Sequence, residues 1–422
     1  MNPLRILCVV ASLLAICAAN PTNLHSNAVS GSLKPSNWLT PSELENTPSL
    51  DELSLQKLEQ MPLEQGAQLM RKYYHIAQIN NDLSPSYVPS PSNIPVYLLQ
   101  KDGKKQAGNL NNLVELAQQQ PNFGDEEVTV FITGLPSNTE TVKKANRKLI
   151  EAYLQRNNHK QQKLQNYKYS EEQTGSRTSS EENSAELKNI KTNPTSLVII
   201  DLGAALNDVK RFAMLNVDET GVMIGKSLVQ LSNACDVPQE IIHIVAQGIA
   251  AHVAGAAGNE FTRLTGQKLR RITALDPSKI LAKDPKVLSG LSRGDADFVD
   301  AIHTSVYGMG TLSRVGDIDF FPNGPSVGVP GAQNVIEATM RATRYFAESV
   351  RPGNEGNFPA VEANSLKQYE NRDGFGKRAL MGIATDFDLR GDYILQVNPK
   401  SPFGMRTPAM KQNQHNHGQW PQ

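Results

Sequence analysis

The sequence contains only three cysteines, and two of them, Cys8 and Cys17, lie in the first 19 residues. A secreted chain that lost this segment would retain Cys235 alone and could form no internal disulfide. Its stability would then come from packing. We expect Cys235 to be a small residue in or near the core, at the end of a helix spanning Val222–Leu231, and not a reactive thiol.

The sequence also lacks an excess of charge of either sign. The 42 Lys and Arg residues balance the 42 Asp and Glu residues, so no bulk electrostatic field draws the chain to nucleic acid or to an anionic membrane. There is no Asn-x-Ser/Thr sequon with a permitted middle residue, so ordinary N-glycosylation is not expected. We predict no nucleic-acid partner.

Long apolar runs are absent beyond the N-terminus. No later stretch reaches the roughly 20 apolar residues that span a membrane, so no membrane span is predicted. The N-terminus itself has Arg5, an apolar run over residues 6–16, and then Cys17-Ala18-Ala19 with small residues at both specificity positions. This pattern predicts a secretory signal peptide, residues 1–19, that is cut after Ala19, and hence a secreted, extracellular protein. A buried N-terminal helix is the alternative.

The 422 residues can hold one large domain together with flanking segments. Residues 20–95 are rich in Ser, Pro and Asn, and they contain two helical patches, Leu53–Met61 and Gln65–Ile79. We interpret this segment as an N-terminal extension that either lies over a core or acts as a spacer.

From residue 96 to residue 404, short apolar strands alternate with helical stretches. The strands are expected at Val96–Leu99, Val128–Ile132, Leu197–Ile200 and Ile241–Val245. Continuous apolar strands separated by helices are typical of a mostly parallel sheet that is buried on both faces. The sequence therefore predicts an α/β fold.

Two segments are too polar to be buried. Residues 155–195 form a polar insert with almost no large apolar side chains, which predicts a mobile surface loop. Residues 405–422 are rich in Gln and Asn and predict a disordered tail. Its His415 and His417 could bind a metal weakly, but a flexible polar tail accounts for them better, and we predict no metal site there.

Residues 246–250 have the spacing of a serine hydrolase's nucleophile turn but contain no serine. That turn reads Gly-x-Ser-x-Gly and joins a strand to a helix through a tight bend. In this chain the middle position is Gly248, between the apolar strand Ile241–Val245 and an Ala-rich helical run, Ala250–Ala257. The bend is therefore expected to be intact, although Gly248 brings no hydroxyl.

Together with this bend, four further blocks make the chain resemble the pancreatic-type secreted lipases. They occur in the family's order within residues 128–404, and they are residues 271–277, 295–304, 319–324 and 391–398. The resemblance implies an α/β-hydrolase fold with a mostly parallel central sheet flanked by helices. Within this family, the lost serine and the hydrophilic insert are most similar to the yolk proteins of higher flies, the lipase-derived vitellogenins.

The resemblance also assigns positions to the catalytic triad. The nucleophile's place is Gly248 and the acid's place is Asp276. The base's place is Thr339, because lipases put His two residues before the arginine that corresponds to Arg341. A triad works only as a unit of nucleophile, base and acid, so the sequence predicts a protein that is not an enzyme, in which Asp276 is a structural carboxylate.

Further departures from the lipase pattern agree with this prediction. The oxyanion-forming His-Gly pair is replaced by Thr133-Gly134, although the backbone N–H groups of Leu135 and Ile249 could still form a dipolar pocket. Only seven residues separate Gly331 from Thr339, where lipases carry a lid. Ser292 stands where a calcium-binding carboxylate is expected, so no metal or other cofactor is predicted.

Two histidines in the family blocks could in principle serve as substitute bases. We expect His252 and His303 to be buried, hydrogen-bonded structural residues. A replacement pair of Ser305 and His303 is the alternative, because neighbours in sequence need not be within reach in space. That alternative corresponds to a secreted esterase or lipase with a rearranged active site.

The polar insert carries candidate modification sites. Tyr167 and Tyr169 precede two glutamates, a setting in which similar secreted proteins are tyrosine-sulfated, and Ser179 and Ser180 precede an acidic pair that favours acidophilic kinases. Either modification adds negative charge and acceptor oxygens. An unmodified solvated loop is an equally good interpretation.

The resemblance implies a yolk storage protein that is secreted into the haemolymph, bound by an oocyte endocytic receptor and stored in yolk granules for the embryo. It also implies a vestigial pocket that could carry an apolar ligand, such as a fatty-acyl steroid conjugate, beside Leu135, Gly248, Ile249 and Asp276. Self-association, or association with related yolk proteins, is expected for a carrier delivered in bulk.

Overall fold

The computed structural model describes residues 47–79, 84–99, 103–120, 122–174, 196–282, 290–325, 328–371 and 376–405. The predicted signal peptide with its cleavage site after Ala19, the serines Ser179 and Ser180, and the tail beyond residue 405 lie outside these residues. Within the described part, Thr47 to Met405 belong to one compact unit.

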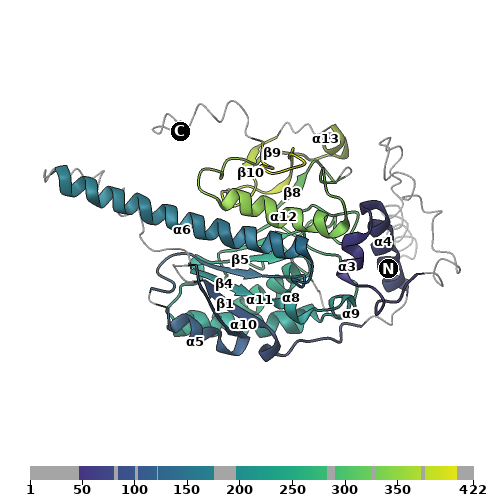
Figure 1. Ribbon diagram of the computed structural model, residues 1–422, viewed down its shortest axis with the longest axis horizontal. Coiled ribbons are helices and arrows are strands. Elements are labelled where there is room, and N and C mark those ends of the chain that lie inside the picture. Colours follow the sequence, from purple (N-terminus) through teal and green to yellow (C-terminus); the bar gives the residue numbers. More distant parts are fainter. Residues whose placement is uncertain are drawn as a thin grey trace, which may run out of the picture. The chain divides into compact units, whose positions relative to one another are not determined.

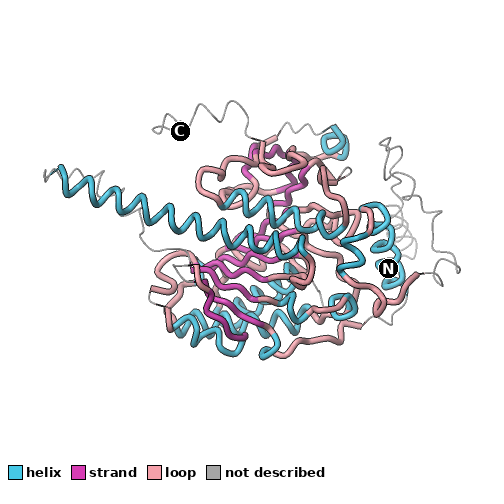
Figure 2. The backbone as a smooth tube through the Cα atoms, viewed as in Figure 1, coloured by secondary structure: helices cyan, strands magenta, loops and turns pink. Residues whose placement is uncertain are grey.

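A twisted sheet forms the centre of this unit (Figures 1 and 2). It has eleven strands in the order β10-β9-β11-β8-β7-β6-β5-β3-β4-β1-β2. The seven strands from β11 to β4 run parallel, while β1 and β2 at one edge and β9 and β10 at the other are antiparallel to their neighbours. The strands are β1 Pro95–Leu99, β2 Lys105–Asn109, β3 Val128–Ile132, β4 Ser196–Ile200, β5 Ile242–Gln247, β6 Arg271–Leu275, β7 Phe298–Ile302, β8 Ile318–Pro322, β9 Pro359–Glu362, β10 Arg378–Leu380 and β11 Gly391–Leu395. The predicted, mostly parallel α/β sheet is confirmed.

Helices cover both faces of the sheet. Successive side chains of a strand point to opposite faces, so Val130 of β3 packs into one apolar cluster with α10 and α11, and Phe131 into a second with α6 and α12. The helices are α3 Leu55–Gln60, α4 Leu63–Ile79, α5 Leu113–Gln118, α6 Glu140–Thr174, α8 Leu202–Ala205, α9 Val209–Ala213, α10 Val217–Ala234, α11 Ala250–Thr265, α12 Val335–Val350 and α13 Leu366–Asn371. Three short 3-10 segments are Pro91–Asn93, Leu110–Asn112 and Gln239–Ile241.

The described part of the N-terminal extension lies over the core. Leu58 of α3 is fully buried, and Met70 and Tyr73 of α4 are nearly so, all three within the cluster that holds α10 and α11. The Glu59 carboxylate accepts a hydrogen bond from the backbone N–H of Thr141 at the start of α6, over 3.0 Å. Between the two interpretations of this segment, the structure favours a cover over the core for residues 47–79.

The first half of the polar insert is helical, which corrects the predicted surface loop. Helix α6 runs without interruption from Glu140 to Thr174 (Figure 1). Its N-terminal half has an apolar stripe at helical spacing, with Val142, Leu149 and Tyr153 buried. Residues 155–174 contain no Gly or Pro and many Gln, Lys and Glu, which are good helix formers, so the helix continues after its apolar stripe ends. Tyr167 and Tyr169 belong to this continuation.

Cys235 lies at the C-terminal end of α10, where its N–H donates to the Leu231 carbonyl. The residue is half-buried and packs against the core. Burial raises the pKa of its thiol, with the nearby Asp236 acting in the same direction. A thiol with a raised pKa is a poor nucleophile, which agrees with the predicted structural role.

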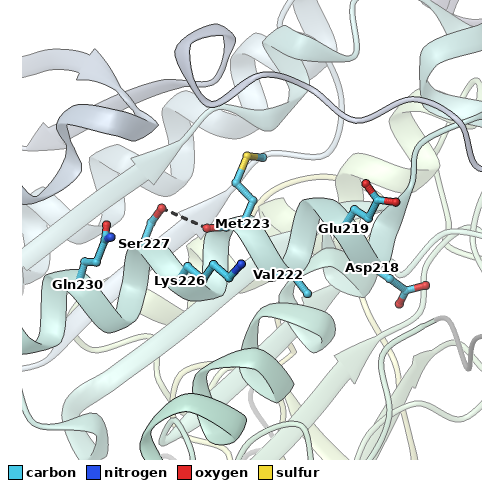
Figure 3. Close-up of a pocket in the computed structure, with 7 residues that line it drawn as sticks. All are labelled: Asp218, Glu219, Val222, Met223, Lys226, Ser227 and Gln230. Atoms are coloured by element: carbon cyan, nitrogen blue, oxygen red, sulfur yellow. Dashed lines mark hydrogen bonds between the residues drawn. The ribbon is translucent and has the colours of Figure 1, made fainter.

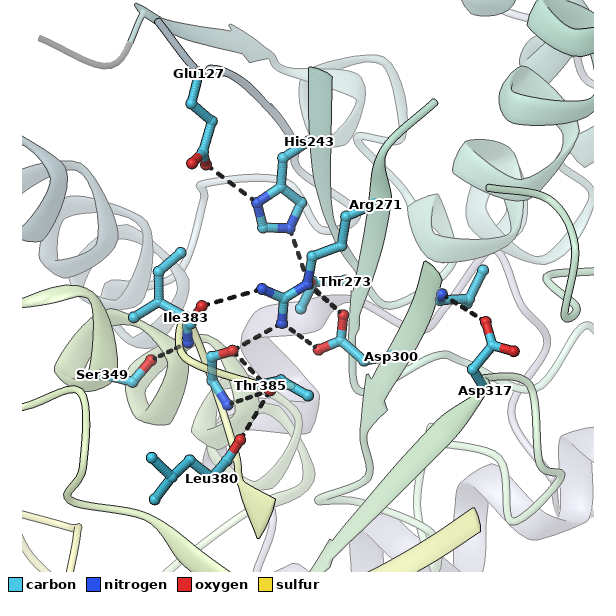
Figure 4. Close-up of polar contacts among 12 residues, drawn as sticks. Glu127, His243, Arg271, Thr273, Asp300, Asp317, Ser349, Leu380, Ile383 and Thr385 are labelled. Atoms are coloured by element: carbon cyan, nitrogen blue, oxygen red, sulfur yellow. Dashed lines mark hydrogen bonds and ion pairs between the residues drawn. The ribbon is translucent and has the colours of Figure 1, made fainter. Parts of the chain in front are cut away.

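A buried polar network crosses the strands β5, β6 and β7 (Figure 4). The Arg271 guanidinium donates two hydrogen bonds to the Asp300 carboxylate, at 2.8 and 2.9 Å, and the Thr273 hydroxyl donates a third at 2.8 Å. His243 lies 2.8 Å from the Thr273 hydroxyl and 3.5 Å from the carboxylate of Glu127. The signal of this network in the sequence is a set of polar residues inside apolar strands, which is too weak to predict it.

Replacing Asp300 by Asn should destabilise the fold strongly, because it leaves the guanidinium of Arg271 buried without a compensating charge. We expect a loss of about 3–5 kcal/mol in the free energy of unfolding, measured by urea denaturation at neutral pH. The matched control is Glu140→Gln, which breaks the exposed ion pair with Lys143 and should cost less than about 1 kcal/mol. Equal losses in the two variants would contradict the structural role of the network.

Candidate functional site

The predicted bend at Gly248 is present at the carboxyl end of β5. Gly248 has φ +55°, in the left-handed region, and α11 begins two residues later at Ala250. Its N–H donates to the carbonyl of Leu275 at the end of β6, over 2.9 Å. A Cβ added at this position would meet the hydroxyl oxygen of Ser278 at 3.1 Å. The turn geometry of a nucleophile elbow is thus retained, with the Ser278 hydroxyl beside the place of the missing side chain.

The loop that would supply an oxyanion hole packs tightly against this bend. A Cβ on Gly134 would lie 1.9 Å from the backbone oxygen of Gln247, so only glycine fits. Thr133, in the place of the family's histidine, donates its hydroxyl to Asp201 over 2.6 Å and accepts the N–H of Gly203 over 3.0 Å. The Thr133 hydroxyl therefore ties this loop to the segment after β4, and Gly134 allows the loop to pack against the end of β5.

Asp276 follows β6 and is completely buried, with φ +54°. Its carboxylate accepts the N–H groups of Thr304 and Ser305, each at 2.8 Å, and also the hydroxyl of Ser305. Burial raises the pKa of Asp276, and these hydrogen bonds oppose that shift. The acid position is thus occupied by a carboxylate that binds the loop after β7.

Ser305 connects the acid position with the base position. Its hydroxyl donates to Asp276 and lies 3.0 Å from the hydroxyl oxygen of Thr339, which is fully buried in the first turns of α12. It also accepts the N–H of Gly310 over 2.9 Å. The structure therefore brings the predicted positions Asp276 and Thr339 together, joined through a serine that the sequence analysis had considered only as a nucleophile.

Both histidines of the family blocks have structural partners. The Nε2 of His252 lies 2.6 Å from the carbonyl oxygen of Ser278, and its Nδ1 accepts the N–H of Leu291 over 3.0 Å. His303 contacts the Thr311 carbonyl at 3.0 Å and the Asp319 carboxylate at 2.8 Å.

The proton on His303 is held by its two oxygen partners. Burial of the ring disfavours the charged form, but the bonds to Asp319 and Thr311 outweigh it and raise the pKa of His303. Both ring nitrogens are thereby engaged, and Ser305 points instead to Asp276 and Thr339. The alternative Ser305–His303 pair does not form.

The apolar space beside Leu135 is filled by the chain itself. The cavity there measures about 10 Å³, room for about one water molecule, and it is lined by Leu55, Leu58 and Met70 from α3 and α4, with Leu206, Val209, Phe212 and Met309 opposite. Gly248, Ile249 and Asp276 do not line it. Of the four residues expected beside the vestigial pocket, only Leu135 lines this small cavity.

The extension is anchored to the shortened lid segment. The N–H of Leu63, the first residue of α4, donates to the carbonyl of Gln333 over 2.8 Å. A Cβ on Gly66 of the same helix would meet the side chain of Val335 at 3.1 Å. Helix α4 thus contacts the short segment between Gly331 and Thr339, in whose place the resemblance to lipases implies a lid.

Carboxylates near the family's calcium loop are satisfied by protein donors. Asp295 accepts the N–H of Ser292 over 2.8 Å and the side-chain amide of Asn259 over 3.0 Å. In the part of the chain that the structure describes, no three His, Cys, Asp or Glu side chains are grouped as metal ligands. The same residues include no helix of sufficient length and apolarity to span a membrane.

A cavity of about 500 Å³ lies elsewhere, along the surface of α10 (Figure 3). Its described lining consists of seven residues of this one helix, namely Asp218, Glu219, Val222, Met223, Lys226, Ser227 and Gln230. A groove with mixed charges along a single helix shares no residue with the crevice around Gly248, so it adds nothing to the hydrolase-like site.

Comparison with known proteins agrees with this geometry. Residues 96–403 match the family model described as Lipase. The chain is 59% identical to Vitellogenin-1 of Ceratitis capitata, over 100% of this chain and 98% of that protein, and 58% identical to Vitellogenin-3 of Drosophila melanogaster, over 95% and 96%. The chain belongs to the vitellogenin branch of the lipase family.

The pancreatic lipases are more distant relatives of this chain. The chain is 29% identical to the human inactive pancreatic lipase-related protein 1, over 37% of each chain, and 34% identical to pancreatic triacylglycerol lipase of Cavia porcellus, over 32% and 31%. The predicted membership of the lipase family, close to the yolk proteins of flies, is confirmed.

The close approach of Gly134 to the bend gives a direct test of the site's geometry. Gly134→Ala should lower the free energy of unfolding by about 3 kcal/mol or more, because its methyl group would overlap the Gln247 carbonyl in a packed core. Gly356→Ala is the control, since a Cβ there meets no atom within 4 Å, and it should change stability by less than about 0.5 kcal/mol. Urea denaturation measures both, and a tolerated Gly134→Ala would contradict the described packing.

Proposed function

We propose that this vitellogenin is a catalytically silent yolk protein, which stores amino acids for the embryo. The observation that supports silence most directly is the hydrogen-bond chain from Asp276 through Ser305 to Thr339. At the three triad positions there is no hydroxyl on the bend, no imidazole opposite, and an acid already bound to another group. General-base activation of a nucleophile needs each of these parts in contact.

Storage and delivery are supported by the relatives and by the N-terminal sequence. Proteins named vitellogenin match this chain over nearly its whole length. The signal peptide with cleavage after Ala19 belongs to the proposal, as do secretion into the haemolymph, uptake through an oocyte endocytic receptor, and deposition in yolk granules. Assembly with further copies or with related yolk proteins is part of the same proposal.

The polar insert is the part of the chain proposed to carry added charge. Sulfation at Tyr167 and Tyr169, and phosphorylation at Ser179 and Ser180, would each add strong acceptor oxygens to this segment. The acidic residues beside these positions support the proposal.

An apolar cargo in the vestigial acyl pocket is not part of the proposal for the conformation described. A fatty-acyl chain needs a pocket of several hundred cubic ångströms, whereas the space beside Leu135 is about 10 Å³ and is closed by α3 and α4. The second candidate, an esterase with a rearranged site, has no supporting contact, because Ser305 and His303 bond to other groups.

The fate of the protein in the animal tests the storage proposal. Tracked with a specific antibody, the protein should appear in the haemolymph of laying females without residues 1–19, accumulate in yolk granules, and disappear as the embryo develops. A lipase that is secreted into the gut, followed by its own antibody in the same samples, is the control and should not accumulate in yolk granules. Persistence of the protein in digestive fluid, with none in the oocyte, would overturn the proposal.

A further inference from the structure

Helix α4 carries a cation, Arg71, for which the described residues supply no counter-ion. The guanidinium of Arg71 lies 5.8 Å from the centre of the Tyr307 ring, and its Nη1 is buried without a hydrogen-bond partner. No carboxylate of the described residues forms an ion pair with it. Burial lowers the pKa of Arg71, and the phenol of Tyr307 opposes that shift. Buried charges in proteins are ordinarily paired, because an unpaired one is costly.

A second cation contacts the same loop, on either side of Tyr307. Lys279, three residues after Asp276, donates its ammonium group to the carbonyls of Val306 and Gly308, each over 3.0 Å, and lies 5.9 Å from the ring centre of Tyr74. Burial is the main cause that lowers the pKa of Lys279 to about 8; the positive charge of Arg71 adds to it and Asp276 opposes it. The two cations therefore repel each other where α4 meets the loops around the crevice.

We propose that Arg71 and Lys279, flanked by the phenols of Tyr74 and Tyr307, form a binding site for a small oxyanion. The ammonium of Lys279 has three N–H donors, of which the two carbonyls use two. The third N–H of Lys279 can therefore bind one oxygen of the anion. The Nη1 of Arg71, which has no hydrogen-bond partner, can bind another oxygen of the same anion, and planar guanidinium groups suit phosphate. All four side chains are half-buried, so an ion can reach them from solvent.

The occupant is free phosphate and not the head group of a lipid. Met70 precedes Arg71, and the Met309 carbonyl accepts the N–H of Lys279 over 2.8 Å. Both methionines line the cavity of about 10 Å³ beside Leu135, so the neighbouring apolar space has no room for an acyl tail. The proposed ion site does not depend on the storage role.

Thermal unfolding in inorganic phosphate tests the site in the full chain. At pH 7 and constant ionic strength, replacing chloride by 20 mM phosphate should raise Tm by several degrees, because a ligand that binds only the folded state stabilises it. Arg71→Gln should weaken phosphate binding at least tenfold in calorimetric titration. The control Arg147→Gln removes an exposed arginine of α6 that makes no ion pair to the described residues, and it should leave the shift unchanged.

A second readout separates binding from a purely structural role of Arg71. Phosphate should protect Lys279 from acylation by acetic anhydride, followed by mass spectrometry, because a bound anion raises the pKa of that ammonium and shields it. The proposal is overturned if phosphate shifts Tm no more than chloride, or if Arg71→Gln keeps the full shift and protection. Lysophosphatidic acid below its micelle concentration should bind no more tightly than phosphate, and a tenfold gain from its tail would instead assign the site to a lipid.

Discussion

The hydrogen-bond chain from Asp276 through Ser305 to Thr339 is the contact on which the account of this protein depends. In a working triad, the acid orients an imidazole that removes a proton from the nucleophile. Here the acid binds the loop after β7, by two backbone N–H groups and one hydroxyl, and a threonine hydroxyl completes the chain from α12. The same carboxylate therefore contributes to packing at the position where the resemblance to lipases places the catalytic acid.

The backbone around this hydrogen-bond chain has two residues in the left-handed region. Gly248 and Asp276 both have φ near +55°, a conformation that is costly for a residue with a side chain. Glycine at position 248 avoids that cost, and at Asp276 three hydrogen bonds from one loop hold the side-chain carboxylate. Helices α3 and α4 cover this region, and their Leu55, Leu58 and Met70 fill the apolar space beside Leu135. A lipase fold can in this way become a densely packed storage protein.

The sequence was sufficient to predict the parts of the fold that depend on local patterns. Four apolar runs gave the strands β1, β3, β4 and β5, and the spacing around Gly248 gave the strand–turn–helix unit, because these signals repeat within a few residues. The polar run after Leu154 was misread as a loop because a helix without an apolar stripe has no periodic signal, although its propensities are helical.

The contacts that decide the site could not be read from the sequence. Ser305 lies 29 residues from Asp276 and 34 from Thr339, and nothing in the chain between them indicates that their oxygens meet. The closure by residues 47–79, and the approach of Arg71 to Lys279, likewise depend on where α4 packs. By contrast, the positions Gly248, Asp276 and Thr339 could be assigned from the sequence, because the family's motifs occur in a fixed order along the chain.

The most direct measurement is the hydrolysis of a short-chain ester by the Gly248→Ser/Thr339→His variant, compared with the unmodified chain. The Asp276 carboxylate is bound to Ser305, and α3 and α4 fill the apolar space beside Leu135. A serine at position 248 and a histidine at position 339 would therefore lack both a free acid and room for the substrate. Neither protein should then release product above the buffer blank or react with a serine-directed phosphonate. Turnover by either protein that the phosphonate abolishes would contradict the account.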